Sequence, residues 1–509
     1  MLANEHASRL AARGKIREAE AIFRAALDRG PMIAVLHTNL GNVLRAQNRL
    51  DEALACHRRA IELSPKTAES HTNLANVLRQ KGDLDQAAAA GRRALELAPG
   101  NPIVCCGLAE TLLPMGHVDE AIALSRRGLA LGPHHAETHY CLGLALLAKG
   151  DLEEGVAKLR RVVELRPANA MAHFSLGRAL IALGEHRSAI AHLSTAQSRD
   201  PKLHQAQFAL GVALLSEGRF SDGWRHYEAR LSHPEHIARI RLLSRPRWQG
   251  QEFKGKTLLL HAEQGLGDSI QMLRYLPMAA ALGGDILLEL QPELIRLMRL
   301  NLGGLPIRLV SRGDSLPPYD FNCPLMSLPL AFNTQLATIP AAIPYISAGD
   351  APALGATRRI GLVWAAAAGS ASGASKSLHL SDFAFLSGLP DAVFVSLQKG
   401  AREEEIRRPP AGLSLEQPVL GDFLDTARAI AGLDLVISVD TSVAHLAGAM
   451  GKPVWVLLPY AADWRWLAGR EDTPWYPTMR LFRQKRREDW SGPLVSMAGA
   501  LPDFHKPGV

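Results

Sequence analysis

The sequence lacks several features that would point to simple classes of function. Its five cysteines form no C-x-x-C pair, and no histidine stands at a spacing that suits zinc. We therefore expect no metal site, and we expect the thiols to be small buried side chains in a reducing compartment. No uncharged apolar run reaches the roughly 18 residues of a membrane helix, and the charged N-terminus has no signal-peptide core. These absences predict a cytoplasmic protein without a membrane span.

Concentrated charge is absent as well. The net charge of +7 comes from Lys and Arg spread through helical segments of a 509-residue chain, which argues against nucleic acid as a partner. Apolar residues make up 47% of the chain, and no long stretch is of low complexity. A globular chain of this length exceeds one hydrophobic core, so we expect two or three domains.

The first half of the chain repeats itself every 34 residues. A proline recurs on this period, and so does a turn residue that is followed five residues later by a small residue. Proline ends each unit because it cannot extend the preceding helix, and small residues let paired helices approach closely. The prolines are Pro31, Pro65, Pro99, Pro133, Pro167 and Pro201. The turn and small residues are Gly14, Asn48, Gly82, Gly116, Gly150, Gly184 and Gly218, with Ala19, Ala53, Ala87, Ala121, Gly155, Ala189 and Gly223.

Each period has room for two helices. Leu40 and Gly41 mark the close contact on the first helix, and Ala53 and Ala60 mark it on the second. The pattern resembles the tetratricopeptide repeat over about residues 1–224, in some seven units. Such units bury their apolar faces only by stacking, so we expect an α-solenoid whose concave face binds a protein or peptide.

Two pairs of asparagines follow the same period, Asn39 with Asn42 and Asn73 with Asn76. We interpret them as a short amide ladder for a peptide backbone, as in the similar repeats of protein O-linked N-acetylglucosamine transferases. Later units carry other residues at these positions, so the ladder stops early. The alternative is that these side chains simply face solvent.

Beyond Trp224 the repeat period fails. Residues 225–256 are rich in Arg and His and predict a docking helix and a connector. Short apolar runs then alternate with helical stretches, which is typical of parallel sheets covered by helices. Two doubly wound domains facing across a cleft, residues 257–350 and 356–509, account for both series. The apolar runs are TLLLHA, DILLEL and IRLV in the first series, and IGLVWA, AVFVSLQ, LDLVISV and PVWVLLP in the second.

The stretch 433–459 predicts a strand, a turn and a helix that together bind an anion. A buried strand ends at Asp440, and a helix begins just after it. Ligands of open parallel sheets bind beyond the carboxyl ends of the strands, and a helix starting there offers free N–H groups. We therefore expect a phosphate at Thr441, Ser442 and Val443. The alternative, equally open on this stretch alone, is that Asp440 or Ser442 only caps the helix.

The first strand of the earlier series leads into a second candidate turn. Gly265 and Gly267 allow close approach of the backbone to a ligand, and Asp268 stands where the next helix begins. A carboxylate at a cleft mouth is suited to take a proton from an acceptor hydroxyl. Helix capping by Asp268 is the competing interpretation.

These two motifs carry a family resemblance. The run His261 to Gln271, together with Asp440 to Ala447 and Gly451-Lys452-Pro453, is similar to the family 9, heptosyltransferase-like glycosyltransferases. The whole chain resembles bacterial proteins that join tetratricopeptide repeats to such a domain. The resemblance implies a two-lobed GT-B-type fold and an inverting transfer from a nucleotide sugar, with no cofactor and no essential metal. It implies that Asp268 is the catalytic base and that the second-lobe turn, with His445, binds the donor phosphates.

Further side chains are candidates for donor binding. Gln398 and Lys399 follow a buried strand, and we expect an amide there to read a nucleotide base and an ammonium to bind phosphate. Lys376 is a further candidate for binding the leaving diphosphate. A fixed cation stabilises the negative charge that builds on the diphosphate as its bond to the sugar breaks. Each of these lysines is also consistent with a solvated surface charge.

One loop departs from the related proteins. Where they carry a polar Gly-Asn-Pro turn, this chain has Ala366 to Ala368 and then a run of Gly, Ala and Ser. Such a loop offers backbone N–H groups but no side-chain ligand. The sequence thus predicts a glycosyltransferase acting on a protein recruited by the repeats. The alternative is a non-catalytic repeat scaffold whose degenerate transferase domain binds nucleotide or partner proteins.

Overall fold

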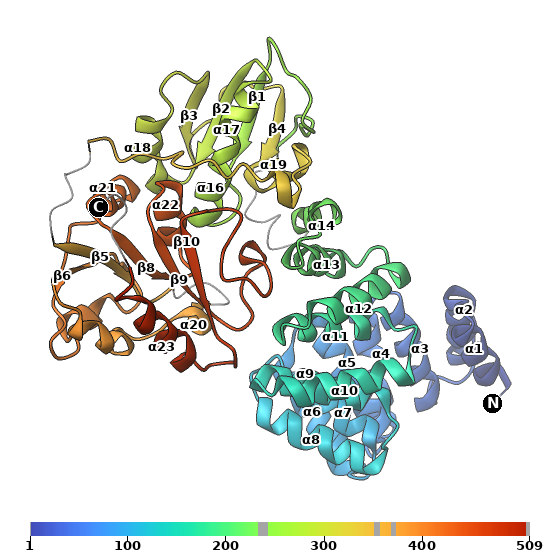
Figure 1. The fold of residues 1–509 in the computed structure, drawn as a ribbon. Coiled ribbons are helices and arrows are strands. Elements are labelled where there is room, and N and C mark those ends of the chain that lie inside the picture. The colour runs from blue at the N-terminus through green and yellow to red at the C-terminus, as the bar shows by residue number, and fades with distance from the viewer. Residues whose placement is uncertain (1, 233–242, 351–356, 368–372, 505–509) are drawn as a thin grey trace. The chain divides into compact units, whose positions relative to one another are not determined.

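The chain folds as two compact units, with the boundary between Leu180 and Ile181. The computed structural model describes residues 2–232, 243–350, 357–367 and 373–504. The described part of the first unit is built from α-helices, and the second unit contains the last helices of the repeat series and two parallel sheets (Figure 1). Within these described ranges no helix is long and apolar enough to cross a membrane.

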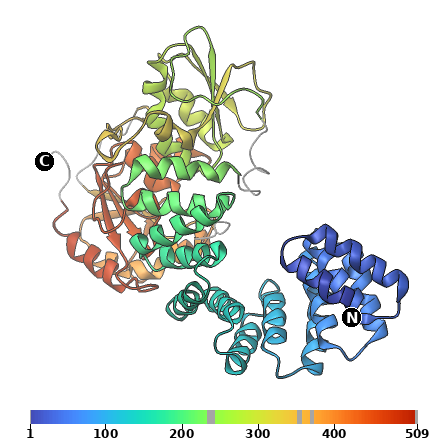
Figure 2. The same ribbon diagram turned by 90° about the vertical axis from the view of Figure 1, so that its right-hand side faces the viewer.

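The first unit consists of antiparallel helix pairs that follow one another along the chain (Figure 2). The predicted turn residues have positive φ, for example 86° at Gly82 and 60° at Asn48. The predicted small residues lie in the helix contacts, where Ala19, Ala53 and Ala87 are fully buried. The helices are α1 (Leu2–Ala12), α2 (Ile16–Arg29), α3 (Ala34–Ala46), α4 (Leu50–Leu63), α5 (Ala68–Lys81), α6 (Leu84–Leu97), α7 (Pro102–Leu112), α8 (Val118–Leu131), α9 (Ala136–Lys149), α10 (Leu152–Leu165) and α11 (Ala170–Ala182). The predicted helical repeats are confirmed.

One buried side chain makes the stability of the first unit sensitive to acid. His57 on α4 is fully buried against Gly41, and neither ring nitrogen has a hydrogen-bond partner among the described residues. Burial lowers the pKa of His57 from its usual 6.5 to about 4. Between these two values the unfolded chain binds a proton that the folded chain does not, so the free energy of unfolding falls as the pH falls.

We expect the wild type to lose about 2 kcal/mol of stability through His57 between about pH 7.5 and about pH 5. Urea titrations of the full chain at both pH values measure this loss. In His57→Leu the pH-dependent loss should be smaller by that amount, whereas His6→Leu, at an exposed position, should behave as the wild type. Equal losses in all three proteins would show that His57 is hydrated and protonates in the folded state.

The last repeat helices belong to the second unit. They are α12 (His186–Arg199), α13 (His204–Ser216) and α14 (Phe220–Tyr227), followed by a 3-10 turn, η1 (Glu228–Ser232). Five aromatic side chains, which we call the tryptophan cluster, join them to the sheet domains: Phe220, Trp224, Tyr227, Trp464 and Trp475. Helix α14 ends at Tyr227, and the compact units meet between Leu180 and Ile181, well before the predicted limit at residue 224. Of residues 225–256, which were predicted to hold a docking helix and a connector, residues 233–242 lie outside the described residues.

The first sheet has four parallel strands in the order β3-β2-β1-β4. The strands are β1 (Thr257–His261), β2 (Asp285–Leu290), β3 (Ile307–Ser311) and β4 (Phe321–Pro324). Helices α16 (Leu266–Met272), α17 (Leu276–Ala280), α18 (Pro292–Asn301) and α19 (Leu328–Ala331) connect or follow them. The sequence predicted β1 to β3 from their apolar runs but not β4, which is short and includes Asn322.

The second sheet has six parallel strands in the order β10-β9-β8-β5-β6-β7. The strands are β5 (Arg358–Val363), β6 (Ala392–Ser396), β7 (Leu415–Glu416), β8 (Leu435–Val439), β9 (Val454–Leu458) and β10 (Met479–Arg483). The helices are α20 (Gly373–Lys376), α21 (Phe423–Ala431), α22 (Ser442–Ala449) and α23 (Ser491–Ala500). The predicted α/β class is confirmed. Strands β7 and β10 were missed because one has two residues and the other carries two arginines.

Candidate functional site

Each sheet reverses its direction of winding next to a central strand. In the second sheet the order runs outward from β5 through β6 to β7 on one side, and from β8 through β9 to β10 on the other. In the first sheet β2 and β4 flank β1 in the same way. Ligands of open parallel sheets bind beyond the carboxyl ends of the strands at such a reversal, where diverging helices leave a crevice. The predicted turns after β1 and β8 lie at these two places.

A cavity of about 710 Å³ joins the two places within the second unit. Eight of the predicted residues line it: Gly265, Gly267, Asp268, Lys376, Asp440, Thr441, Ser442 and His445. Helix α13 contributes Phe208, Val212 and Ser216 to the wall, and the segment after β9 contributes Asp463, Trp464 and Arg465. The two predicted turns therefore share one cavity.

Helices α16 and α22 meet closely, near the N-terminus of each (Figure 1). A Cβ atom on Gly267 would lie 2.9 Å from Cδ2 of His445 and 3.3 Å from Cα of Ser442. The contact explains why residue 267 has no side chain, since even a methyl group would force the two helices apart. Glycine at this position lets backbone approach backbone. Gly267 also lines the cavity, where the sequence predicted approach of the backbone to a ligand.

The Asp268 carboxylate performs the capping role and also faces the cavity. Its Oδ2 accepts a hydrogen bond from the Gly265 N–H at 2.7 Å, and its Oδ1 pairs with the Arg465 guanidinium. Burial raises the pKa of Asp268, and the neighbouring Arg465 opposes this rise. A carboxylate with a raised pKa is a stronger base than a solvated one, so capping and proton transfer are compatible here.

Lys376 and Asp440 form a largely buried ion pair at the part of the cavity wall that belongs to the second sheet domain. The Lys376 Nζ lies 2.6 Å from Oδ2 of Asp440, and the two side chains are 18% and 7% exposed. Burial alone would lower the pKa of Lys376, but Asp440 raises it above its usual value. The lysine therefore stays charged at the cavity wall, and Asp440 holds the ammonium in place.

No side chain caps helix α22. Its N-cap residue is Thr441, whose side chain makes no capping bond and whose Oγ1 lies 3.0 Å from Oγ of Ser438. Asp440 bonds Lys376 instead, so the simple capping interpretation of Asp440 or Ser442 does not hold. The first N–H groups of a helix have no partner within the helix. Of the predicted anion-binding residues at this helix start, Thr441 and Ser442 line the cavity, whereas Val443 is not one of the lining residues.

His445 is a neutral side chain at the cavity wall. Its ring is buried, stacks on Trp466, and places Nδ1 3.0 Å from the hydroxyl of Tyr476. Burial lowers the pKa of His445 to about 3, and burial raises the pKa of Tyr476. Either atom can donate in this bond, because the neutral ring carries its one proton on Nδ1 or on Nε2. His445 brings no positive charge at neutral pH.

The structure places Gln398 and Lys399 outside the cavity. The Gln398 amide is buried: Oε1 accepts from the N–H groups of Trp364 and Ala365, and Nε2 donates to the carbonyl of Ala401. Lys399 donates to the carbonyls of Leu420 and Gly421. The sequence predicted that these side chains bind a nucleotide base and a phosphate. In the structure their polar groups instead bond the backbone of neighbouring loops. The loop that departs from the related proteins begins at Ala366, which is buried and whose N–H donates to the Ser377 hydroxyl. Residues 368–372 of this loop lie outside the described residues.

Arg465 is a site residue that the sequence did not single out. It lies in a 3-10 turn, η7 (Trp464–Trp466), and is 8% exposed. Its guanidinium joins the two lobes, because it bonds Asp268 and Gln271 of the first and Asp463 of the second. It also lies on the face of Trp464, 4.7 Å from the ring centroid. The only signal in the sequence was an arginine between two tryptophans after a buried strand.

A second buried arginine supports the cavity wall. Arg230 of η1 has no exposed surface, and its Nη2 lies 2.9 Å from Oε1 of Glu263 and 2.7 Å from Oγ of Ser327. Its Nη1 pairs with Glu228. Burial raises the pKa of Glu263, which lines the cavity, and Arg230 opposes that rise.

The four predicted asparagines lie on α3 and α5 of the first unit. Asn39 donates to Asn4 at 2.8 Å, and Asn76 accepts from Arg79 at 3.4 Å. In the described residues, Oδ1 of Asn42 and Nδ2 of Asn73 are buried without a hydrogen-bond partner. Both atoms have almost no accessible surface, so neither is open to a ligand as the side chains stand.

Comparisons with known proteins identify the repeats. Residues 31–100, 78–140 and 146–215 match the tetratricopeptide repeat family, so the N-terminal part of the chain is a tetratricopeptide solenoid. Protein FlbA of the bacterium Caulobacter vibrioides is 32% identical over 319 residues, which cover 56% of this chain and 53% of FlbA. The chain thus spans about half the length of this curated relative.

Several solved repeat structures are similar as well. YrrB, described as a tetratricopeptide protein with an unusual peptide-binding site, is 24% identical with a TM-score of 0.29. The match covers 37% of this chain and 96% of YrrB. The Cut9–Hcn1 assembly is 19% identical with a TM-score of 0.42, and the match covers 45% of each chain.

Proposed function

We propose that this protein is a glycosyltransferase that moves a sugar from a nucleotide sugar to a polypeptide held by the repeats. The two sheets are then the lobes of a GT-B-type enzyme. One observation carries the proposal: a partly buried carboxylate from the first lobe and an uncapped helix with a lysine from the second line the same cavity. Base and anion site are the two parts that sugar transfer from a diphosphate requires.

On the donor side, the diphosphate binds at the start of α22. The N–H groups of Ser442 and Val443 and the Lys376 ammonium stabilise the charge that grows on the leaving group as its bond to the sugar breaks. His445 adds an uncharged imidazole ring to the cavity wall. Because the cation is already held by Asp440, little reorganisation is needed at the moment of reaction.

On the acceptor side, Asp268 takes the proton of the acceptor hydroxyl. The acceptor oxygen forms a bond to the anomeric carbon while the bond from that carbon to the phosphate oxygen breaks. The proton goes to the carboxylate, and the electron pair goes to the diphosphate. Attack from the side opposite the leaving group inverts the anomeric configuration, in line with an inverting enzyme.

The repeats supply the polypeptide acceptor in this proposal. Helix α13 forms part of the cavity wall through Phe208, Val212 and Ser216, so the last repeat borders the reacting groups. Asn42 and Asn73 are partly exposed, and side-chain amides suit the backbone of an extended peptide, which carries both donors and acceptors. Tetratricopeptide arrays bind partners on such extended surfaces.

The rival function is a scaffold that binds nucleotide or partner proteins without turnover. Two observations favour it: the Asp268 carboxylate is already paired with Arg465, and the loop at Ala366 and Ala367 provides no side-chain ligand. Both functions use the anion site, so binding alone does not separate them. Turnover by the wild type does.

Nucleotide binding tests the anion site directly. In calorimetry with UDP, GDP and ADP, we expect one diphosphate to bind, and we expect Lys376→Ala to weaken its affinity roughly 10- to 100-fold. The variant loses a charge-assisted bond and leaves Asp440 unpaired, where it repels phosphate. Lys399→Ala is the matched control, because its ammonium bonds two carbonyls outside the cavity.

Two results would contradict this assignment. If no nucleoside diphosphate binds the wild type, both the enzyme and the nucleotide-binding scaffold fail. If Lys399→Ala weakens binding as much as Lys376→Ala, the phosphates do not occupy this cavity.

A further inference from the structure

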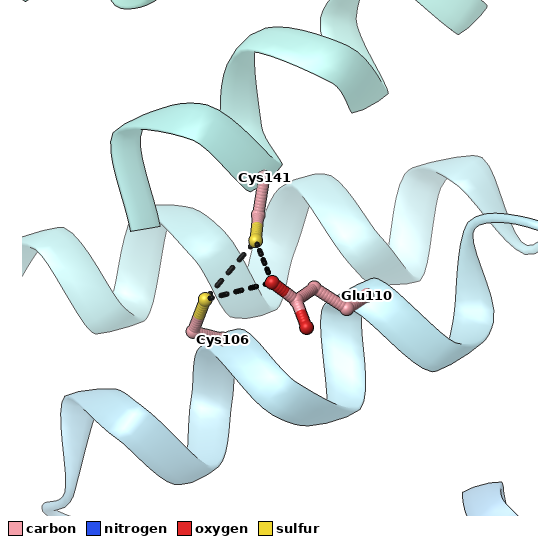
Figure 3. A group of neighbouring side chains, drawn as sticks. All are labelled: Cys106, Glu110 and Cys141. Atoms are coloured by element: carbon pink, nitrogen blue, oxygen red, sulfur yellow. Dashed lines mark hydrogen bonds between the residues drawn. The ribbon is translucent and has the colours of Figure 1, made fainter. Parts of the chain in front are cut away.

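Three side chains of the first unit converge at a point that the proposed transferase does not use. Cys106 and Glu110 are four residues apart on α7, which places them on one face of that helix, and Cys141 lies on α9. The two Sγ atoms are 3.0 Å apart, and Glu110 Oε1 lies 3.4 Å from the Cys141 sulfur and 4.0 Å from the Cys106 sulfur (Figure 3). Two sulfurs and one oxygen thus surround a common space.

The surroundings orient the carboxylate toward the sulfurs. Glu110 Oε2 pairs with Nη2 of Arg79 at 2.7 Å, so the other oxygen, Oε1, is the one that faces the thiols. Both cysteines are 4% exposed, and the glutamate side chain is 31% exposed. The oxygen ligand therefore lies on the side that opens toward solvent, and the sulfurs lie behind it.

The spacing of the three atoms fits a metal ion. A point equidistant from all three lies roughly 2 Å from each, and zinc binds sulfur at about 2.3 Å and carboxylate oxygen at about 2.0 to 2.2 Å. A small outward shift from the plane of the three atoms reaches these distances. The two sulfurs, now 3.0 Å apart, must also separate by less than about 1 Å to reach the spacing of roughly 3.8 Å that tetrahedral zinc sets, and the fourth corner then lies away from the three ligands.

We propose that Cys106, Cys141 and Glu110 bind one thiophilic divalent cation of the Zn²⁺ type, with a water as fourth ligand. Binding releases the two thiol protons, because thiolates are the ligands. Two thiolates and a carboxylate carry three negative charges. The dication and Arg79 offset them, so the buried group becomes neutral as a whole.

A cation explains the cluster better than a disulfide does. Disulfide formation proceeds through a free thiolate, which a carboxylate beside both sulfurs disfavours. A disulfide would also leave Glu110 without a role, whereas a cation uses all three groups and the Arg79 contact. The ion would join α7 to α9, the first helices of neighbouring repeats. By the 34-residue period, Cys141 and Glu110 occupy the positions that Asn39 and Asn42 hold earlier in the array.

Cobalt is a suitable probe, since a cobalt–thiolate bond absorbs in the near ultraviolet. The full-length chain is reduced, freed of metal with a chelator and titrated with Co²⁺ alone. We expect one Co²⁺ per chain, a thiolate charge-transfer band, and loss of that band when Zn²⁺ is added. Cys141→Ser should lose the band, and Glu110→Gln should weaken cobalt binding at least tenfold while circular dichroism shows intact helices. Cys105→Ser is the matched control, because this buried neighbour is outside the cluster, and it should bind as the wild type.

Three results overturn the proposal. The first is a wild type without a charge-transfer band. The second is a folded Cys141→Ser variant that keeps the wild-type band. The third is a Cys106–Cys141 disulfide in protein purified without reductant that, once reduced, binds no cobalt. Since the test follows metal and not sugar transfer, it fails or succeeds independently of the proposed enzyme activity.

Discussion

Asp268→Asn is expected to lower turnover by roughly 10²- to 10⁴-fold, the usual contribution of a general base, while nucleotide affinity stays within a few fold of the wild type. Asparagine keeps an oxygen that accepts the Gly265 N–H, so the start of α16 is preserved. It lacks the basic carboxylate that takes the acceptor proton. The donor is the nucleotide sugar that contains the diphosphate found to bind in calorimetry. Its release of nucleoside diphosphate measures the turnover rate, and calorimetry of the variant measures the affinity.

The matched control for this experiment is Asp472→Asn. Asp472 is a carboxylate that pairs with Arg470 at the surface and is 68% exposed, outside the cavity. Its replacement should leave turnover unchanged. Wild-type turnover in Asp268→Asn would mean that the proton goes to another group. Nucleotide binding without any turnover by the wild type would favour the scaffold.

The largest effect on stability is expected at Arg230. Arg230→Ala leaves Glu263 buried without its cation, and breaking one half of a buried ion pair costs about 3–5 kcal/mol. That is a large fraction of the stability of a typical domain. Urea unfolding followed by tryptophan fluorescence reports on the second unit, because Trp224, Trp464 and Trp475 of the tryptophan cluster lie there.

Two further variants test the reason for this effect. Arg230→Met combined with Glu263→Leu removes both charges and should recover most of the lost stability. Arg296→Ala removes an exposed arginine that pairs with Asp422 and Asp425, and it should cost under about 1 kcal/mol. If Arg230→Ala lowers the free energy of unfolding no more than Arg296→Ala does, the Glu263 carboxylate is hydrated in the variant and the buried ion pair does not stabilise the fold.

The sequence predicted the parts of this protein that depend on local pattern. Helix pairs follow from a 34-residue period, and the positive φ at Gly82 and Asn48 follows from the turn residues that mark it. The turns after β1 and β8 were located because strand ends in parallel sheets converge, and Asp268 and Lys376 do line one cavity. These inferences need only the order of elements and the rule for where their ends meet.

Side-chain partners across the fold were not predictable in this way. Gln398 follows its strand as expected, but its amide turns back onto the backbone of a neighbouring loop. Arg465 meets Asp268 197 residues away in the chain. No spacing rule relates such a pair, since the packing of separate elements sets the distance between them.

The tryptophan cluster decides where this protein tolerates recombination. A graft that replaces everything before residue 225 discards Phe220 and Trp224, and it uncovers the parts of Trp464 and Trp475 that these two side chains contact. A chimaera joined near Leu180 keeps α12 to α14, and with them the wall that α13 gives to the cavity. New binding specificities are therefore best introduced by exchanging the upstream repeats and leaving the last ones in place.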